Sequence, residues 1–177
     1  MKRIRYQVAS SLDGYIAGPN GEYDWIPMDP GIDFSALFDQ FDTLLMGRRT
    51  YEELSFDAPE YREKQIVVFS RTLRQQDHPD VRIIPEASKE VVDEFRAGSG
   101  KDIWLYGGGE LFRALLDLGC VDTVEPAVVP VLLGGGRPLL PTPAGAHELS
   151  LTRQRVYHTS GIVMLEYDVA GRLGRQG

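Results

Sequence analysis

The feature that most constrains the fold of this chain is a strand pattern that runs through three glycines directly into a helical pattern. Apolar residues over 103–106 are followed by Gly107, Gly108 and Gly109, and the helical pattern begins at Glu110. Glycines let the backbone approach a ligand closely, and the start of a helix offers free N–H groups and a partial positive charge. The pattern predicts an anion-binding turn, with a merely tight turn as the alternative.

Short strand and helix patterns alternate along most of the chain. Alternating polar and apolar residues over 3–9 predict a first strand, and the glycine-, proline- and aspartate-rich stretch 13–31 predicts a long loop of the kind that is usually functional. Further buried strands are predicted over 43–46, 65–69, 81–84 and 103–106. Helices are predicted over 33–41, with Asp33 as N-cap, over 88–97 and over 110–118.

The C-terminal third favours antiparallel structure. The patterns over 151–157 and 162–169 flank Ser160 and Gly161 and predict a hairpin. The segment 121–133 is strand-like but contains Pro126 and Pro130, which belong at an edge or a bulge. A second triplet, 134–136, is followed by no helix and is interpreted as a turn or bulge.

Together these elements predict a three-layer α/β/α fold. Alternating strand and helix units favour a mixed, mainly parallel sheet covered on both faces, with the C-terminal hairpin closing one edge. Residues 1–170 are expected to form one domain, and 171–177 a polar, glycine-bearing tail that frays. Ligands of such sheets collect beyond the carboxyl ends of the strands.

Composition excludes several classes of function. The single cysteine, Cys120, rules out an intrachain disulfide and a multi-cysteine zinc site, and indicates a cytoplasmic location. The three histidines have no metal-ligand spacing, so no metal is expected. A net charge of −7 disfavours nucleic acid as a partner, and the lack of any long apolar run disfavours a membrane span.

Two further clusters of polar and basic residues follow predicted strands. Arg48 and Arg49 would open a helix, where cations oppose the helix dipole unless an anion such as a phosphate shares the site. The alternative is that both are solvated or pair with Glu52 and Glu53. Arg71 follows the strand 65–69 and suits the 2′-phosphate of NADP, although Ser-Arg-Thr is also an ordinary turn.

Five segments in this order resemble the dihydrofolate reductase superfamily, especially its stand-alone bacterial branch related to the reductase domain of the riboflavin-pathway deaminase/reductase. They are residues 11–17 (SLDGYIA), 46–52, 69–73, 106–111 and 130–134. The resemblance extends from Met1 to about Val169. It implies the dihydrofolate reductase-like fold, NADPH as cofactor, a small-molecule substrate and, as is common in the branch, a homodimer. The apolar run 128–133 is one candidate for the dimer surface, with buried core as the simpler explanation.

The resemblance also implies the cofactor-binding residues. Those expected to hold phosphates are Gly47, Arg48, Arg49 and Thr50, with Ser70 and Arg71 at the adenosine 2′-phosphate. Those expected at the pyrophosphate are Gly107, Gly108, Gly109, Glu110 and Leu111, and the Gly107–Gly108 peptide is expected to be cis. Those expected to flank the nicotinamide are Ala9, Ile16 and Gly18, with the loop 13–24 as a lid.

The catalytic residue is less constrained, because hydride transfer is the cofactor's own chemistry and the protein need supply only alignment and a proton. Folate-reducing relatives carry a carboxylate at the start of the first helix, and Asp33 is the nearest position here. A plain N-cap is the alternative role for Asp33, and Asp29 is a rival acid. Tyr23 and Trp25 could stack on a flat substrate or simply anchor their loop.

Three departures from the family limit the resemblance. One cysteine leaves no zinc deaminase module. Glu125 and Pro126 interrupt a strand where alternating apolar residues are expected, and residues 24–27 differ from the folate enzymes. The chain is therefore interpreted as an NADPH-dependent reductase of a pterin-, pyrimidine- or carbonyl-type molecule. The alternative is a nucleotide-binding regulatory protein without turnover. A P-loop phosphotransferase is set aside, since no glycine loop leads into Lys-Ser or Lys-Thr.

Overall fold

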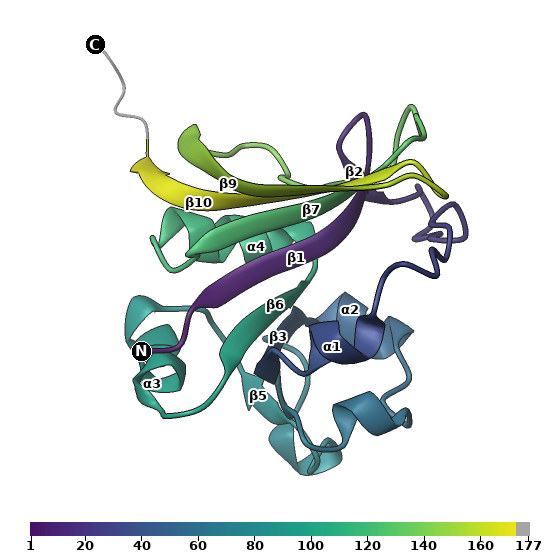
Figure 1. Cartoon of the computed structure of the whole chain (residues 1–177). Coiled ribbons are helices and arrows are strands. Elements are labelled where there is room, and N and C mark those ends of the chain that lie inside the picture. The colour runs from purple at the N-terminus through teal and green to yellow at the C-terminus, as the bar shows by residue number, and fades with distance from the viewer. Residues whose placement is uncertain (173–177) are drawn as a thin grey trace.

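An eight-stranded sheet forms the centre of the molecule. The structure, a computed structural model, describes residues 1–172. The strand order is β5-β4-β3-β6-β1-β7-β10-β9 (Figure 1). The parallel strands are β1 (Ile4–Ser11), β3 (Phe41–Gly47), β4 (Gln65–Phe69), β5 (Arg82–Ile84), β6 (Asp102–Gly107) and β7 (Thr123–Val129). The antiparallel hairpin β9 (His147–Tyr157) and β10 (Ile162–Arg172) closes one edge. The expected mixed, mainly parallel sheet is confirmed.

Helices cover both faces of the sheet, which confirms the three-layer fold. On one face lie α3 (Lys89–Ala97) and α4 (Gly109–Asp117), and on the other lie α1 (Phe34–Phe38) and α2 (Arg48–Glu53). Short 3₁₀ turns occur at Pro59–Tyr61 and Gln75–Asp77. As expected, Asp33 caps α1, but that helix ends at Phe38 rather than at Phe41, which already begins β3.

The alternation in β1 sends neighbouring side chains to opposite faces. Ile4 and Tyr6 are fully buried on the side of α4, where Tyr6 stacks on Phe112 with ring centroids 3.9 Å apart. Full burial of an aromatic or aliphatic side chain of this size contributes about 1.5–3 kcal/mol each. Arg5 and Gln7 point to the other face, toward α1. This one strand therefore joins the main core to a polar cavity.

Strands β1 and β6 pair over only two positions and then diverge (Figure 1). The paired positions are Ile4 with Ile103 and Arg5 with Trp104. Beyond them the Trp104 indole N–H donates to the Gln7 carbonyl over 2.9 Å. Within residues 1–172, the divergence leaves the C-terminal half of β1 without a paired strand on that side.

The structure corrects the expectation for 121–133. Strand β7 is interior, between β1 and β10, and Pro126 pairs in register with Val8 rather than lying at an edge. Proline brings no N–H to a ladder, and the pairing of β7 with β10 is missing at Glu125 and Pro126. The strand tolerates the proline at that interruption without a shift of register against β1 or β10, so the prediction of an edge or a bulge was wrong for Pro126, whereas Pro130 lies beyond the end of β7.

Two loop expectations are refined. The loop 13–31 contains a short strand, β2 (Tyr15–Ala17), which pairs with β8 (Arg137–Pro138) directly after the bend formed by the second glycine triplet. At the C-terminus, Gly171 and Arg172 belong to β10, and the rest of the expected tail, 173–177, lies outside the described residues.

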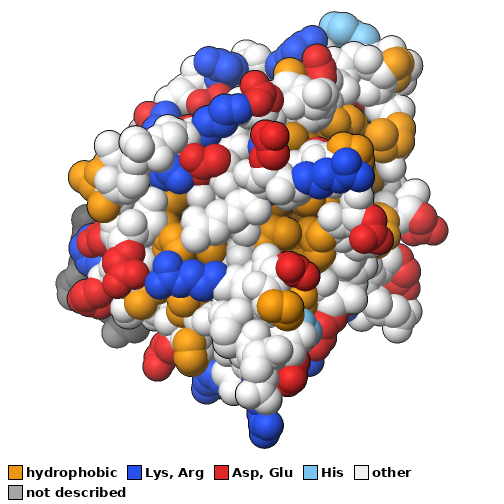
Figure 2. Space-filling view, turned by 90° about the horizontal axis from the view of Figure 1, so that it is seen from below, with side chains coloured by type: hydrophobic (Ala, Val, Ile, Leu, Met, Phe, Trp, Pro, Cys, Tyr) orange, Lys and Arg blue, Asp and Glu red, His pale blue; other side chains and the backbone are white. Residues whose placement is uncertain are grey.

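No helix within residues 1–172 is long and apolar enough to cross a bilayer. Figure 2 shows one face of the molecule, on which basic and acidic side chains are interspersed rather than gathered by sign. The expectations about nucleic acid and cytoplasmic location stay predictions.

Candidate active site

A cleft of about 870 Å³ opens at the carboxyl ends of the parallel strands, between α2, α4 and the loop that contains β2. Its volume falls within the range of small-molecule sites, roughly 300–1,000 Å³. Twelve of the residues expected at a cofactor line it: Ile16, Gly47, Arg48, Arg49, Thr50, Ser70, Arg71, Gly107, Gly108, Gly109, Glu110 and Leu111. Ala9 and Gly18 are not among its lining residues.

The glycine turn between β6 and α4 forms one wall of this cleft. The Gly107–Gly108 peptide is cis, as expected, and Gly108 caps α4 without any side-chain hydrogen bond. A Cβ on Gly109 would lie 2.6 Å from the Pro138 carbonyl oxygen, so only glycine allows the segment after β8 to pack here. The N–H groups of the first turn of α4 are left to an anion in the cleft.

The basic residues of the cleft divide into paired and unpaired groups. Arg48 forms an ion pair with Glu52 over 3.0 Å. For Arg48, therefore, the structure has the pairing with a helix carboxylate that the sequence offered as the alternative to phosphate binding. Within residues 1–172, Arg49 and Arg71 have no carboxylate oxygen within 4.0 Å. Ser70 shapes the turn that carries Arg71, because its Oγ accepts the backbone N–H groups two and three residues later over 3.2 and 3.0 Å. Arg49 and Arg71 thus bring positive charge without an ion-pair partner in residues 1–172 to a cleft that is also lined by Glu53, Glu86 and Glu110.

The loop 13–24 is tied to the segment around β8. Asp13 accepts hydrogen bonds from the Ser11 hydroxyl over 2.6 Å and from the Gly134 N–H over 2.7 Å. These bonds, that of Ser11 first, lower the pKa of Asp13 to about 2. The expected lid therefore begins at a turn that the ionised Asp13 carboxylate ties to Gly134.

Arg137 is a cleft residue that the sequence reasoning missed. Its guanidinium donates two hydrogen bonds to Glu53 at the end of α2, over 2.9 and 3.0 Å, and this interaction raises the pKa of Arg137. The ion pair connects β8, which pairs with the lid strand β2, to the opposite wall of the cleft. The only signal in the sequence was a basic residue directly after a glycine triplet.

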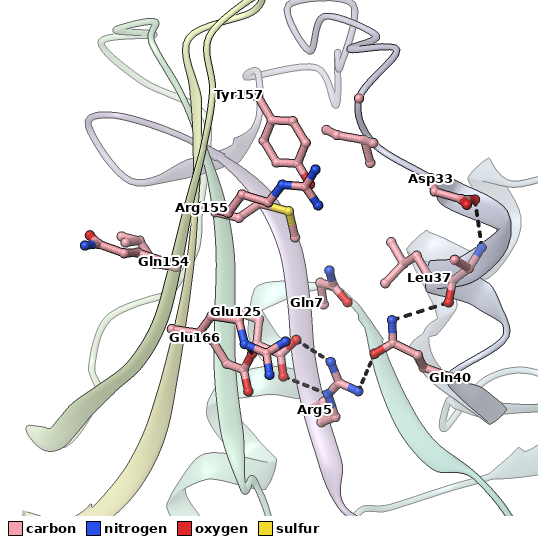
Figure 3. Close-up of a pocket in the computed structure, with 16 residues that line it drawn as sticks. Arg5, Gln7, Asp33, Leu37, Gln40, Glu125, Gln154, Arg155, Tyr157 and Glu166 are labelled. Carbon is pink, nitrogen blue, oxygen red and sulfur yellow. Dashed lines mark hydrogen bonds and ion pairs between the residues drawn. The ribbon is translucent and has the colours of Figure 1, made fainter.

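A second cavity, of about 380 Å³, lies between α1 and the sheet face to which Arg5 and Gln7 point (Figure 3). Strands β7, β9 and β10 complete its walls. Asp33 lines this cavity, and its Oδ1 accepts the Ala36 N–H over 2.9 Å. The candidate acid is therefore both the N-cap of α1 and a cavity residue.

The floor of the second cavity is a buried ion pair. Arg5 and Glu125 form two hydrogen bonds of 2.7 and 2.8 Å, with side chains that are 14% and 4% exposed. Thr123 donates to Glu125 over 2.7 Å. Arg5 also donates to Gln40 over 2.9 Å (Figure 3). Glu125, which interrupts the apolar pattern of its strand, is the neutralising partner of Arg5.

Two groups in this cavity are not committed to protein partners. The Arg155 guanidinium lies 4.7 Å from the centroid of the Tyr157 ring and has no carboxylate oxygen within 4.0 Å in residues 1–172. The Oε1 of Gln7 is buried and has no hydrogen-bond partner in the same part of the chain. The sequence signal that could have predicted this cavity is a polar residue, such as Gln7, within the pattern of a strand.

The rival acid and the loop aromatics are placed differently. Asp29 is buried and accepts the N–H groups of Gly31 and Ser160 over 2.8 and 3.0 Å, and the contact with Ser160 lowers its pKa. It lines neither cavity and ties the loop to the C-terminal hairpin. Trp25 donates to the carbonyl of its own loop and packs against the hairpin, whereas Tyr23 lines the cleft.

The strand order, the helices on both faces and the glycine turn at the carboxyl edge define an α/β protein of the dihydrofolate reductase-like fold. Within that class the chain belongs to the RibD C-terminal domain family, whose sequence profile matches residues 2–165.

Three similar proteins support this placement. The uncharacterized protein YyaP of Bacillus subtilis (strain 168) is 34% identical over 94% of each chain. A protein of Shewanella sp. PV-4 provisionally assigned to riboflavin biosynthesis has a crystal structure with a TM-score of 0.79 and 28% identity, over 96% of this chain and 99% of that one. A diaminohydroxyphosphoribosylaminopyrimidine deaminase/5-amino-6-(5-phosphoribosylamino)uracil reductase of Thermotoga maritima shares the fold, with a TM-score of 0.73 and 16% identity. The match covers 96% of this chain and 57% of that enzyme.

Proposed function

We propose that this protein is an NADPH-dependent reductase that transfers hydride to a small planar molecule bound in the second cavity. The observation that carries the proposal is that consecutive residues of β1, Gln7 and Val8, line the two cavities from opposite faces of the strand. Strands β1 and β6 pair only as far as Arg5 and Trp104, so a cofactor ring in the cleft and a substrate ring in the cavity would meet through the gap beyond that pair, the direct contact that hydride transfer requires. Reductase domains of this family typically use NADPH.

The cleft residues fit a phosphorylated dinucleotide. The first turn of α4 leaves N–H groups for a pyrophosphate, and the unpaired guanidiniums of Arg49 and Arg71 suit further phosphate charge. Arg71, at the end of β4, is the proposed partner of the 2′-phosphate that distinguishes NADPH from NADH. When bound, the cofactor supplies the hydride, and the protein holds both reactants in place.

Reduction of the substrate also requires a proton, and we assign the role of proton donor to Asp33. Its Oδ1 is held by the helix N–H, whereas Oδ2 makes no hydrogen bond within residues 1–172. A carboxyl on the cavity wall with one free oxygen is suited to exchange a proton between solvent and a bound ring. Burial and the hydroxyl of Tyr61 raise the pKa of Tyr106, a residue of the cleft, so its hydroxyl stays protonated; the Tyr61 and Tyr106 hydroxyls share a hydrogen bond of 2.9 Å in which either can be the donor.

The test is a titration with NADPH and NADH followed by tryptophan fluorescence. We expect the original chain to prefer NADPH, and Arg71→Ala to weaken NADPH binding about 10- to 100-fold while leaving NADH unchanged, since hydrogen bonds to charged groups contribute about 1.5–3 kcal/mol. Arg74→Ala, an exposed arginine outside the cleft, is the matched control. No binding of either cofactor would refute the proposal. Binding without turnover on a broad substrate panel would favour the regulatory alternative.

A further inference from the structure

The ion pair between Arg137 and Glu53 spans the cleft, and the proposed reduction does not use it. Its two hydrogen bonds, of 2.9 and 3.0 Å, join residues that are 84 positions apart in the sequence. Arg137 lines one wall of the cleft from β8, and Glu53 lines the other wall from the end of α2. The two side chains are 34% and 46% exposed, so the pair lies on the solvent side of the cleft. It therefore bridges the two walls near the opening.

The backbone that carries Arg137 is held in one conformation. Pro138 follows it, and a residue before proline is restricted to extended conformations. Arg137 also pairs with Ala17 in the ladder between β8 and β2. The preceding Gly136 has a φ of +141° and lies against the Ala17 carbonyl, where a Cβ would be only 2.2 Å from the oxygen. The side chain of Arg137 therefore starts from a backbone that β2 and the glycine turn keep in place.

The loop 13–24 packs directly on the guanidinium of Arg137. A Cβ on Gly21 would lie 2.7 Å from the Arg137 Nη2, so glycine lets the loop approach this closely. A backbone hydrogen bond of 2.8 Å from the Gly18 N–H to the Glu22 carbonyl closes the turn around Gly21. The pKa of Arg137 is raised first by its hydrogen bonds to Glu53 and also by the nearby Glu22 carboxylate. The loop, β8 and α2 therefore all meet at one side chain.

We propose that the Arg137–Glu53 pair is a strap that holds the loop 13–24 over the cleft and must open before a ligand enters or leaves. An ion pair between half-exposed side chains contributes little to the stability of a fold, but a small free energy is enough to set how often a loop opens. Arg48 and Glu52 form a similar pair four residues apart on one helix, so that pair connects no two walls of the cleft. Because ions screen exposed charges, the opening of the strap should depend on salt.

Hydrogen exchange of the ligand-free protein measures this opening directly. Glu53→Gln keeps the shape of the side chain without its charge, and we expect it to speed exchange in the peptides 14–22 and 133–141 about two- to fivefold, the range that exposed ion pairs give. Sodium chloride at about 1 M should have the same effect on the original chain and no further effect on the variant. Glu52→Gln is the matched control, because it removes an ion pair from the same helix and should leave both peptides unchanged.

The exchange of α3 separates a strap from a general loss of stability, since α3 and α2 lie on opposite faces of the sheet. Equal acceleration in the peptide 89–97 and in the loop would mean that the pair merely supports the fold, and would overturn the inference. Unchanged exchange in both loop peptides would overturn it as well. Arg137→Met combined with Glu53→Gln should open the loop no further than Arg137→Met alone, because the two side chains act through one contact. Additive effects would contradict a strap.

Stopped-flow binding of NADPH adds a second measurement, which rests on the proposed function, whereas the exchange measurements do not. We expect both the association rate and the dissociation rate to rise in Glu53→Gln, because a lid that opens more often admits and releases a ligand faster. The faster dissociation is decisive, since removing a negative charge would by itself hold an anionic cofactor longer. Glu52→Gln, which removes the same charge from the same helix, measures that electrostatic effect.

The outcomes of the two measurements are distinguishable. Unchanged or slower dissociation in Glu53→Gln would overturn the inference. A rise confined to the dissociation rate would overturn it too, because Glu53 would then be a contact of the ligand rather than part of a strap. Failure of NADPH to bind to either protein, while exchange in the loop peptides responds as expected, would refute the proposed function and leave the strap supported.

Discussion

The buried ion pair between Arg5 and Glu125 allows a quantitative test of how the second cavity is built. Removing one partner of a buried pair leaves an uncompensated charge and costs about 3–5 kcal/mol. In Glu125→Leu the stranded Arg5 keeps its bond to Gln40 and lies 3.5 Å from Asp102, so we expect the lower value, about 3 kcal/mol. At roughly 2–4 °C per kcal/mol for a chain of this size, the unfolding midpoint should fall by about 6–12 °C.

The variant of the other partner, Arg5→Met, and the double variant complete a double-mutant cycle. Among the described residues, Arg5→Met leaves Glu125 with the Thr123 hydroxyl as its one side-chain donor and should cost closer to about 5 kcal/mol. Arg5→Met/Glu125→Leu removes both charges and should be close to the original chain, because a buried pair gains little over apolar residues of similar size. Urea unfolding followed by circular dichroism measures all four proteins. A cost below about 1 kcal/mol for Glu125→Leu, or additive costs in the double variant, would refute this reasoning.

Three further outcomes follow from the structure. Gly136→Ala should lower the unfolding midpoint and weaken NADPH binding. The φ of Gly136 is +141°, and a Cβ there would lie 2.2 Å from the Ala17 carbonyl oxygen in the lid. Gly135→Ala, whose Cβ would have no atom within 4 Å, should change neither the midpoint nor the binding in the same assays. The lowered pKa of Asp29 means that its contribution to stability is present above about pH 4 and is lost as the pH falls through the folded-state value. Asp29→Asn should therefore flatten the pH dependence of the midpoint below pH 4, and an unchanged profile would contradict this assignment. Strand β9 is an edge of the sheet and exposes Leu151, so we propose that the expected homodimer forms along β9. Leu151→Lys should then reduce the mass measured by light scattering from that of two chains to that of one. A monomeric original chain would refute this proposal.

Much of the fold was predictable because its signals are local. The hairpin, β4 and α3 follow from side-chain periodicity and from turn or capping residues such as Gly98 and Gly161. Twelve of the expected cofactor residues line one cleft, since strands that run in parallel bring their carboxyl ends to the same edge of the sheet. Their assignment to NADPH stays a prediction.

The second cavity could not be predicted in the same way. Gln7, Glu125 and Arg155 come from three strands that are far apart in the sequence, and each by itself reads as an ordinary polar residue in a strand. The ion pair between Glu53 and Arg137 could not be predicted either, because its two residues are far apart in the sequence and meet only across the cleft. Asp29 and Asp33 are the same residue type four positions apart, yet only Asp33 lines the cavity.

The sequence by itself determined the classes of element and the residues at the strand ends, because periodicity, capping and glycine turns act over a few residues. Only the tertiary structure decided which strands lie side by side, and with them the interior position of Pro126, the partner of Arg5 and the burial of a Gln7 Oε1 that has no hydrogen-bond partner within residues 1–172. The physical reason is that strand order depends on crossover connections and on burial summed over the whole sheet, which no local pattern records.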